Sequence, residues 1–380
     1  PYCDFNSHRQ TGELPEAAYV DALLSDFRRE RLAVHGRPLH SVFIGGGTPS
    51  LMSAAAYQKL FTGLREMVAF KEDIEITLEV NPGTWEHDRF QAYLEAGINR
   101  LSLGVQSFQD SKLQALGRIH SADEAHKAIA SLSDLGFRNF NIDLMHGLPD
   151  QSNADAIYDL KQAIALKPAH ISWYQLTIEP NTVFYSKTPA LPPDDTLWAI
   201  QEEGQSLLAV EGYEQYEISA YSQSGQRSRH NLNYWQFGDY IGIGAGAHGK
   251  LTLLPGEGDA ASSPTGQIIR NWKTRMPADY LAADSIMSTL PEKRFEAGRR
   301  VLEANEMPIE FMMNVLRLNG GAACRVFSER TGQPLSVMEG PLNLAVQKRL
   351  LENPISGPEG WFKPTPRGRL FLNDLLELFA

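Results

Sequence analysis

Five short β-rich segments in the first half of the chain alternate with helical patterns, and this alternation restricts the fold more than any other feature. The segments cover residues 41–44, 74–80, 100–105, 139–144 and 170–177. The helical patterns cover residues 16–34, 54–69, 87–96, 121–135 and 153–166. Strands that alternate with helices at this spacing are typical of βαβ units. We therefore predict an α/β fold with a parallel sheet.

A polar or glycine-rich sequence follows each predicted strand. These sequences are GGGTP (45–49), EVNPG (79–83), GVQSF (104–108), DLMHGLP (143–149) and TIEP (177–180). In barrels and open α/β sheets, ligands bind at the carboxyl ends of the parallel strands. Five successive strands with such ends predict one ligand site along this edge of the sheet.

The individual residues at this edge suggest a polar ligand. Three glycines allow the backbone to approach a ligand closely, and Thr48 adds a hydroxyl group. No Lys-Ser/Thr follows the last glycine, so this is not a P-loop, and a tight turn is the alternative. Glu79, Gln106 and Asp143 could hold ribose hydroxyls or an ammonium group, or could cap their strands toward solvent.

Arg118, in the sequence LGRIH, is a further candidate at this edge. A guanidinium group binds carboxylates through two parallel hydrogen bonds, so Arg118 could pair with a ligand carboxylate. The alternative is an ordinary surface arginine at the start of a helix.

Charge and cysteine content exclude some protein classes. The formal net charge is −11, which argues against a general nucleic-acid binder. Two cysteines, Cys3 and Cys324, make no disulfide framework, and we expect a reducing, cytoplasmic compartment. No apolar run reaches about 18 residues, so we predict no transmembrane helix and only partner-mediated, peripheral contact with membranes.

The second half is less regular. A Pro/Asp-rich connector (189–195) precedes a predicted helix (196–210), and a polar loop is predicted at 222–229. The Gly/Ala/Ser/Pro-rich stretch 255–266 is predicted to be mobile. From about residue 290 the pattern is helical. The end, GWFKPTPRGRLFLNDLLELF, predicts a strand-like piece, a helix start at Thr-Pro and a final helix, as in a small winged-helix-like domain.

The sequence HNLNYW places His230 beside Asn231, Tyr234 and Trp235. A histidine beside aromatic rings suits a flat aromatic ligand or haem iron. A hydrogen-bonded core histidine is the alternative, and His248 presents the same two choices.

Cys3 lies between two aromatic residues, Tyr2 and Phe5, in a chain that starts without Met. A lone cysteine is usually a small hydrophobic residue. Its position ahead of the first predicted strand suggests instead the end of a cluster-binding loop, with further cysteines expected upstream of Pro1.

Several of these sequences together resemble one family. PYCDF, GGGTPS, EVNPG, GVQSF, LGRIH, NIDLMHGLP and HNLNYWQFGDY look like the HemW branch of the radical S-adenosylmethionine (SAM) superfamily. These proteins are relatives of the oxygen-independent coproporphyrinogen III oxidase, HemN. The resemblance implies a partial (β/α)6 TIM-like radical SAM barrel (1–190), an α/β extension (191–289) and a small winged-helix-like C-terminal domain (290–380).

The resemblance also implies cofactors and site residues. The family's C-x-x-x-C-x-x-C loop binds a [4Fe–4S] cluster, which makes Cys3 the third ligand and places the other two before Pro1. A reduced cluster would split SAM. The residues that match SAM-contact positions are Gly46, Gly47, Thr48, Glu79, Gln106, Arg118 and Asp143.

Two features separate HemW proteins from the oxidase. The oxidases resemble C-x-x-x-C-x-x-C-x-C, and Phe5 stands where they carry the last cysteine. HNLNYW resembles the H-N-x-x-Y-W sequence linked to haem binding, with His230 as the leading ligand candidate. The resemblance therefore implies a haem chaperone that delivers haem to membrane haemoproteins such as respiratory enzymes.

Two alternatives remain open. The first is SAM-dependent oxidative decarboxylation of coproporphyrinogen III on the same barrel, which the Phe5 substitution disfavours. The second is a binding module without radical chemistry, in which the C-terminal domain contacts a protein or nucleic acid. The acidic net charge opposes a nucleic-acid partner. A homodimer is left open.

Overall fold

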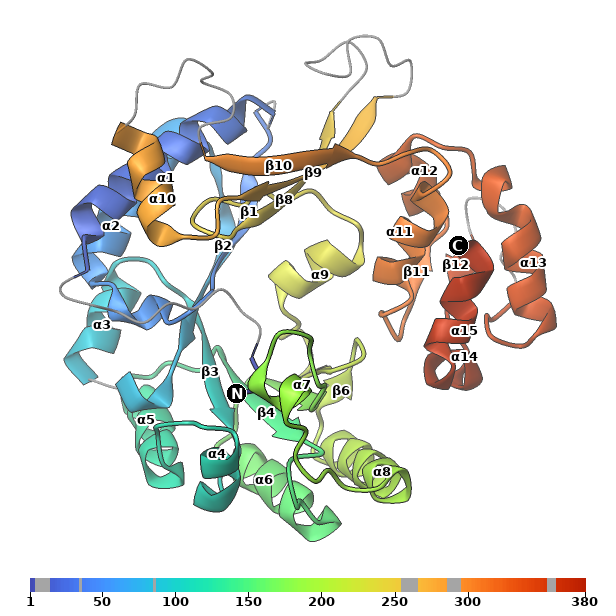
Figure 1. Cartoon of the computed structure of the whole chain (residues 1–380), viewed down its shortest axis with the longest axis horizontal. Helices are drawn as coiled ribbons and strands as arrows, with labels where there is room; N and C mark the ends of the chain where they lie inside the picture. Colours follow the sequence, from blue (N-terminus) through green and yellow to red (C-terminus); the bar gives the residue numbers. More distant parts are fainter. Residues whose placement is uncertain (4–13, 34–35, 85–86, 254–265, 286–294, 354–359) are drawn as a thin grey trace. The chain divides into compact units, whose positions relative to one another are not determined.

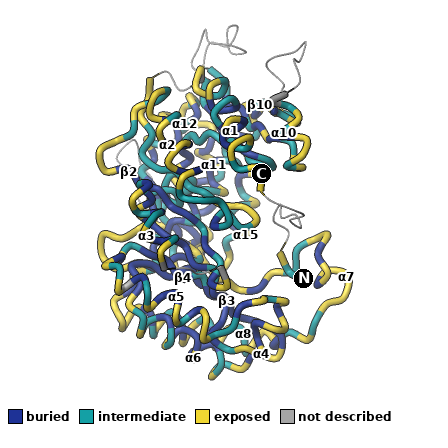
Figure 2. Tube along the Cα trace, turned by 90° about the vertical axis from the view of Figure 1, so that its left-hand side faces the viewer, coloured by how far each residue is buried: buried dark blue, intermediate teal, exposed yellow. Residues whose placement is uncertain are grey.

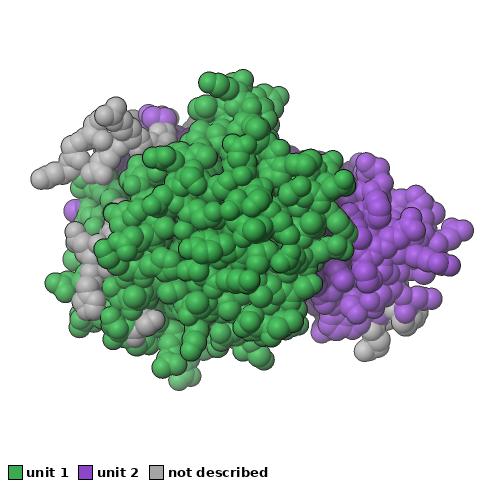
Figure 3. Space-filling view, turned by 90° about the horizontal axis from the view of Figure 1, so that it is seen from below, with its two compact units in different colours: residues 1–16, 39–62, 70–228 green, residues 17–38, 63–69, 229–380 purple. Residues whose placement is uncertain are grey.

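The structure is a computed structural model that describes residues 1–3, 14–33, 36–84, 87–253, 266–285, 295–353 and 360–380. The chain divides into two compact units, coloured in Figure 3. The first unit contains residues 1–16, 39–62 and 70–228, and the second contains 17–38, 63–69 and 229–380. No helix in the described ranges has the length and apolar character needed to cross a membrane.

The first unit is built on a curved, seven-stranded sheet with the order β1-β2-β3-β4-β5-β7-β6. Its first five strands are parallel: β1 (Leu39–Ile44), β2 (Phe70–Val80), β3 (Arg100–Gln106), β4 (Phe140–His146) and β5 (His170–Gln175). The antiparallel strands β7 (Ala220–Ser222) and β6 (Glu214–Gln215) complete it. This half-barrel confirms the predicted α/β class and partial barrel.

Helices follow the parallel strands, as the sequence pattern predicted. They are α2 (Ala54–Met67), α3 (His87–Glu95), α4 (Asp110–Ala115), α5 (Ala122–Asp134), α6 (Asn153–Ala165), α7 (Val183–Ser186) and α8 (Asp194–Val210). Figure 1 shows α3, α5, α6 and α8 on the outer side of the curved sheet. Each of the five predicted strands and the helices between them is confirmed, with ends that differ by up to four residues.

The two faces of the central strands differ in chemistry. Ile142 and Leu144 of β4 are fully buried, and Leu160 of α6 is equally buried in the outer layer. Removing such aliphatic side chains from water contributes roughly 1.5–3 kcal/mol each. The alternate β4 residues, Asn141 and Asp143, belong to the other face because successive strand residues point to opposite sides. Figure 2 shows β3 and β4 as mostly buried.

The second unit combines a small sheet with helices. Its antiparallel sheet has the order β10 (Glu296–Val301), β9 (Gln267–Lys273) and β8 (His248–Leu253). The accompanying helices are α1 (Glu16–Glu30), α9 (Arg229–Trp235) and α10 (Pro277–Ser285). The prediction of helix from residue 290 is wrong at β10, because this charged strand is held by backbone pairing with β9 rather than by an apolar pattern of its own.

The remaining elements form a helical cluster around Phe311, Phe327 and Phe362, each fully buried. Its helices are α11 (Met307–Val315), α12 (Arg325–Thr331), α13 (Glu339–Gln347), α14 (Pro366–Leu370) and α15 (Leu372–Leu376). The strands β11 (Ala322–Ala323) and β12 (Trp361–Phe362) pair with each other. The Thr-Pro helix start is confirmed, since the Thr365 hydroxyl caps α14. The predicted mobile stretch 255–266 lies, except for its last residue, outside the described residues.

Candidate functional site

The glycine turn after β1 lies against the side chain of Glu79, at the end of β2. Gly46 has a φ of +113°, a conformation that L side chains rarely adopt. Its N–H donates a hydrogen bond to Glu79 Oε2 at 3.2 Å. A Cβ atom on Gly45 would lie 3.1 Å from the same carboxyl group and 2.8 Å from the Phe43 ring. The backbone conformation therefore favours glycine at Gly46, and the lack of space for a side chain favours glycine at Gly45.

Asp143, on β4, accepts three hydrogen bonds. The donors are Ser102 Oγ at 3.0 Å, Asn141 Nδ2 at 2.8 Å and the Tyr174 hydroxyl at 3.1 Å. Burial raises the pKa of Asp143 despite these donors. Its two oxygens are thus held in a fixed orientation at the carboxyl edge.

Glu79 and Asp143 repel each other. Burial, and then the charge of Asp143, raise the pKa of Glu79 to about 7. Within the described residues, the hydrogen-bond partners of both carboxyl groups are neutral. Two carboxylates without a cationic partner in the described part of the chain fit a positively charged ligand, and SAM carries an ammonium and a sulfonium group. The charge and the hydrogen-bond acceptors of these two carboxylates therefore fit SAM.

Gln106 ends β3 in a strained conformation. Its φ is +70°, which is costly for a residue other than glycine, and the pairing register with β4 shifts between Gly104 and Gln106. Gly104 lies against both Gln106 and Arg118: a Cβ atom there would be 3.2 Å from Gln106 Nε2 and 3.9 Å from Arg118 Nη2. The structure thus brings two predicted site residues together.

Asp159, on α6, holds the turn that follows Gln106, and sequence reasoning missed it. Its carboxylate accepts hydrogen bonds from Ser107 Oγ at 2.8 Å and from the Phe108 N–H at 2.9 Å. Burial raises its pKa to about 6. Acidic residues are rarely buried without a partner, so an aspartate on the apolar face of a predicted helix was the sequence signal that could have identified Asp159.

Arg118 binds the start of the chain. Its Nη2 donates to the Tyr2 hydroxyl at 2.6 Å, and its guanidinium group lies 5.7 Å from the centre of the Tyr2 ring. The Phe184 N–H donates to the Pro1 carbonyl at 3.0 Å. Cys3, a free and exposed thiol, directly follows Tyr2, which contacts Arg118, one of the predicted SAM residues.

The metal-ligand set in the described part of the chain is small. No group of three or more His, Cys, Asp or Glu side chains there is arranged to hold a metal ion. Cys324 is buried in the second unit. The printed sequence has no cysteine besides Cys3 and Cys324, so a three-thiolate cluster at Cys3 would need thiolates from outside this sequence.

His230 lies in an aromatic cluster of the second unit. Its ring meets Tyr234 edge-on at 4.9 Å and 62°, and Tyr234 stacks on Tyr240 at 4.3 Å and 30°. The Trp235 ring lies 4.3 Å from the guanidinium group of Arg317. All residues of α9 are partly exposed rather than buried. The predicted grouping of His230 with aromatic rings is present.

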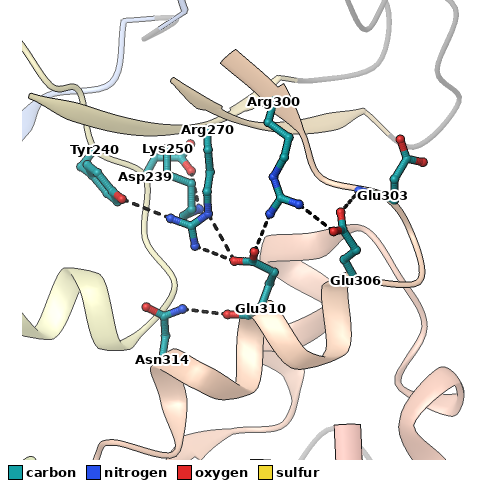
Figure 4. A network of polar contacts seen from close by, with 9 residues as sticks. All are labelled: Asp239, Tyr240, Lys250, Arg270, Arg300, Glu303, Glu306, Glu310 and Asn314. Atoms are coloured by element: carbon teal, nitrogen blue, oxygen red, sulfur yellow. Dashed lines mark hydrogen bonds and ion pairs between the residues drawn. The ribbon is translucent and has the colours of Figure 1, made fainter. Parts of the chain in front are cut away.

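A charge network adjoins these rings (Figure 4). Arg270 donates to Glu310 at 2.7 Å and to the Tyr240 hydroxyl at 3.4 Å. Arg300 bridges Glu310 and Glu306 at 2.8 and 2.6 Å. Glu306 and Glu310 therefore each have an arginine partner.

The sequence is similar to known proteins over its whole length. A family model described as the radical SAM superfamily matches residues 1–163. The heme chaperone HemW of Escherichia coli is 48% identical over 379 residues, covering 100% of this chain and 94% of that protein. The heme chaperone HemW of Haemophilus influenzae is 47% identical over 383 residues, with the same coverage.

A solved structure supports the fold. Coproporphyrinogen III oxidase (HemN) from Escherichia coli, described as a radical SAM enzyme, has a TM-score of 0.77 and 21% identity, covering 100% of this chain and 86% of that chain. This likeness concerns the fold alone. The end-to-end identity with the chaperones is far higher, and this chain belongs to the HemW family of the radical SAM superfamily.

Proposed function

We propose that this protein is a haem chaperone that binds a [4Fe–4S] cluster, SAM and haem, and delivers haem to membrane haemoproteins such as respiratory enzymes. The observation that carries this proposal is the 47–48% identity, over the whole chain, with proteins named heme chaperone HemW. In this proposal the protein acts in the cytoplasm and meets membranes through its recipients.

The carboxyl edge of the first unit is the proposed SAM site. Gly46, Gly47 and Thr48 would contact the methionyl end, while Glu79 and Asp143 supply negative charge for the cationic groups. Gln106 and Arg118 complete the set, and Cys3 is one cluster ligand. When bound, a reduced cluster supplies the electron that cleaves SAM; the chain positions SAM and limits its contact with water.

The proposed haem ligand is His230. Imidazole is a common ligand of haem iron, and the Tyr234–Tyr240 stack offers flat aromatic surface beside it. Arg270, which reaches the Tyr240 hydroxyl, places a cationic group next to this surface.

Haem titration of His230 variants tests the haem site. We expect His230→Ala to lower haem affinity at least about tenfold, because the iron would lose the proposed imidazole ligand. Iron and sulfide content of the reconstituted protein should stay unchanged. His248→Ala, which removes an exposed histidine of the same unit, is the matched control and should bind haem normally. Equal affinities in wild type and His230→Ala would remove His230 from the site.

An anaerobic assay tests the function as a whole. Protein with its cluster is supplied with haem and a membrane haemoprotein lacking haem, and haem transfer is followed by absorbance. A parallel reaction contains reductant, SAM and coproporphyrinogen III. We expect haem transfer and no protoporphyrinogen. Robust protoporphyrinogen formation would instead identify an oxidase, and absence of haem transfer would overturn the proposal.

A further inference from the structure

A chain of buried hydrogen bonds runs beneath the proposed SAM site and ends at Asp143. Asn141 and His170 are paired neighbours on β4 and β5, and Ser102 pairs with Asn141 from β3. Tyr216 follows β6 and reaches the same row. Asn141, His170 and Tyr216 are only 2%, 1% and 2% exposed, so these polar groups depend on one another for hydrogen bonds.

The direction of each hydrogen bond in this chain can be deduced from Asp143. A carboxylate only accepts, so the Asn141 side chain must present its NH2 group to Asp143. That nitrogen lies 2.8 Å from Asp143 Oδ1 and 2.8 Å from Ser102 Oγ. The Asn141 oxygen therefore faces the other way, where it receives Ser172 Oγ at 3.0 Å.

The same logic sets the tautomer of His170. Its Nδ1 lies 2.7 Å from Asn141 Oδ1, an acceptor, so Nδ1 carries the proton. Burial, and then Arg100, hold the pKa of His170 well below its usual range, so the ring is neutral and Nε2 accepts. Tyr216 fills that position: its hydroxyl lies 2.9 Å from Nε2 and must donate.

We propose that Tyr216, His170 and Asn141 form a positioning relay that holds Asp143 as an oriented acceptor for the ligand at the carboxyl edge. This inference rests on the proposed SAM site. None of the three residues needs to contact the ligand. Each fixes the orientation of the next, and Asn141 together with Ser102 fixes both oxygens of Asp143.

Two tyrosines offer a matched pair of variants. Tyr216 and Tyr213 are 2% and 3% exposed, and each hydroxyl donates its proton to a buried acceptor. Tyr213 donates to the Pro168 carbonyl at 2.8 Å, outside the relay. Tyr216→Phe and Tyr213→Phe therefore delete the same group at similar burial, and we expect similar decreases in stability toward urea.

SAM affinity separates the two variants. In anaerobic calorimetry with the cluster-loaded protein, we expect Tyr216→Phe to bind SAM about three- to tenfold more weakly and Tyr213→Phe to bind it like wild type. Cluster content, from iron and sulfide analysis, should be equal in all three. Equal affinities in both variants would overturn the relay, whereas failure of wild type to bind SAM would overturn the proposed site itself.

Variants of His170 add a rescue test. His170→Asn keeps an N–H donor at the position of Nδ1, whereas His170→Gln places its amide at the position of Nε2. Both remove the ring, so a purely structural role predicts similar loss of SAM affinity. We expect His170→Asn to retain more affinity, because Asn141 keeps its donor. An affinity for His170→Gln equal to or above that of His170→Asn would contradict the relay.

Discussion

Each unit holds a pair of largely buried carboxylates, but among the described residues only one pair has a cationic partner. In the second unit, Lys273 is 2% exposed and contacts Asp26 at 2.7 Å as well as Glu30. The Tyr280 hydroxyl donates to Asp26 at 2.7 Å. In the first unit, Glu79 and Asp143 meet neutral donors alone among the described residues.

The difference separates a structural cluster from the proposed binding site. Buried charges are costly unless a partner compensates them. Where the chain provides that partner, as at Lys273, the cluster stabilises the fold. Where the described residues provide none, as at Glu79 and Asp143, the two carboxyl groups repel each other and a cationic ligand would relieve this repulsion, which is typical of functional sites.

Removing the cation of the compensated pair should have the largest effect. Lys273→Met removes the counter-charge of the buried Asp26 and the partly exposed Glu30, so we expect a loss of about 3–5 kcal/mol in the free energy of unfolding. Urea unfolding followed by circular dichroism measures it. Lys127→Met, which breaks an exposed pair with Asp123, should leave the urea midpoint unchanged. Similar losses in both variants would show that Lys273 is not a special partner.

Neutralising one carboxylate of each pair should change stability in opposite directions. Glu79→Gln removes repulsion and a buried charge, so we expect the ligand-free protein to gain about 1–3 kcal/mol at pH 8. Glu30→Gln weakens the attraction to Lys273 and should destabilise. Thermal unfolding of both variants decides this, and a loss of stability in Glu79→Gln would contradict the assigned repulsion. SAM affinity of Glu79→Gln should fall about tenfold.

The pH dependence of binding should be the smallest effect. The pKa of Glu79 is raised to about 7, so the ligand-free carboxyl is largely protonated below that pH. A cationic ligand prefers the ionised form, and its affinity should rise with pH up to about 7, by at most about tenfold per unit. Calorimetry between pH 6 and 8 measures this, and Glu79→Gln should flatten the profile.

The raised pKa of Glu79 also makes the free energy of unfolding depend on pH. Folded Glu79 holds its proton more tightly than the unfolded chain, whose ordinary pKa is 4.5. Its contribution to the free energy of unfolding therefore falls as pH rises from about 4.5 to about 7 and is constant above. An unchanged contribution across this range, measured as the difference between wild type and Glu79→Gln, would argue against the shift.

Local patterns in the sequence determined the parallel strands, the helices between them and the polar carboxyl edge. Periodicity and glycine content are properties of neighbouring residues, so they predicted Gly46, Glu79, Gln106 and Asp143 at one edge before any contact was known. The same reasoning failed at β10, whose strand state depends on pairing with β9.

Only the tertiary structure decided how these residues are held and charged. Asp159 lies about 50 residues from the turn that it fixes, and Tyr216 lies 46 residues from His170. No periodic pattern links residues so far apart. Their pairing follows from which strands and helices pack together, and burial in that packing sets the charge of Glu79 and the tautomer of His170.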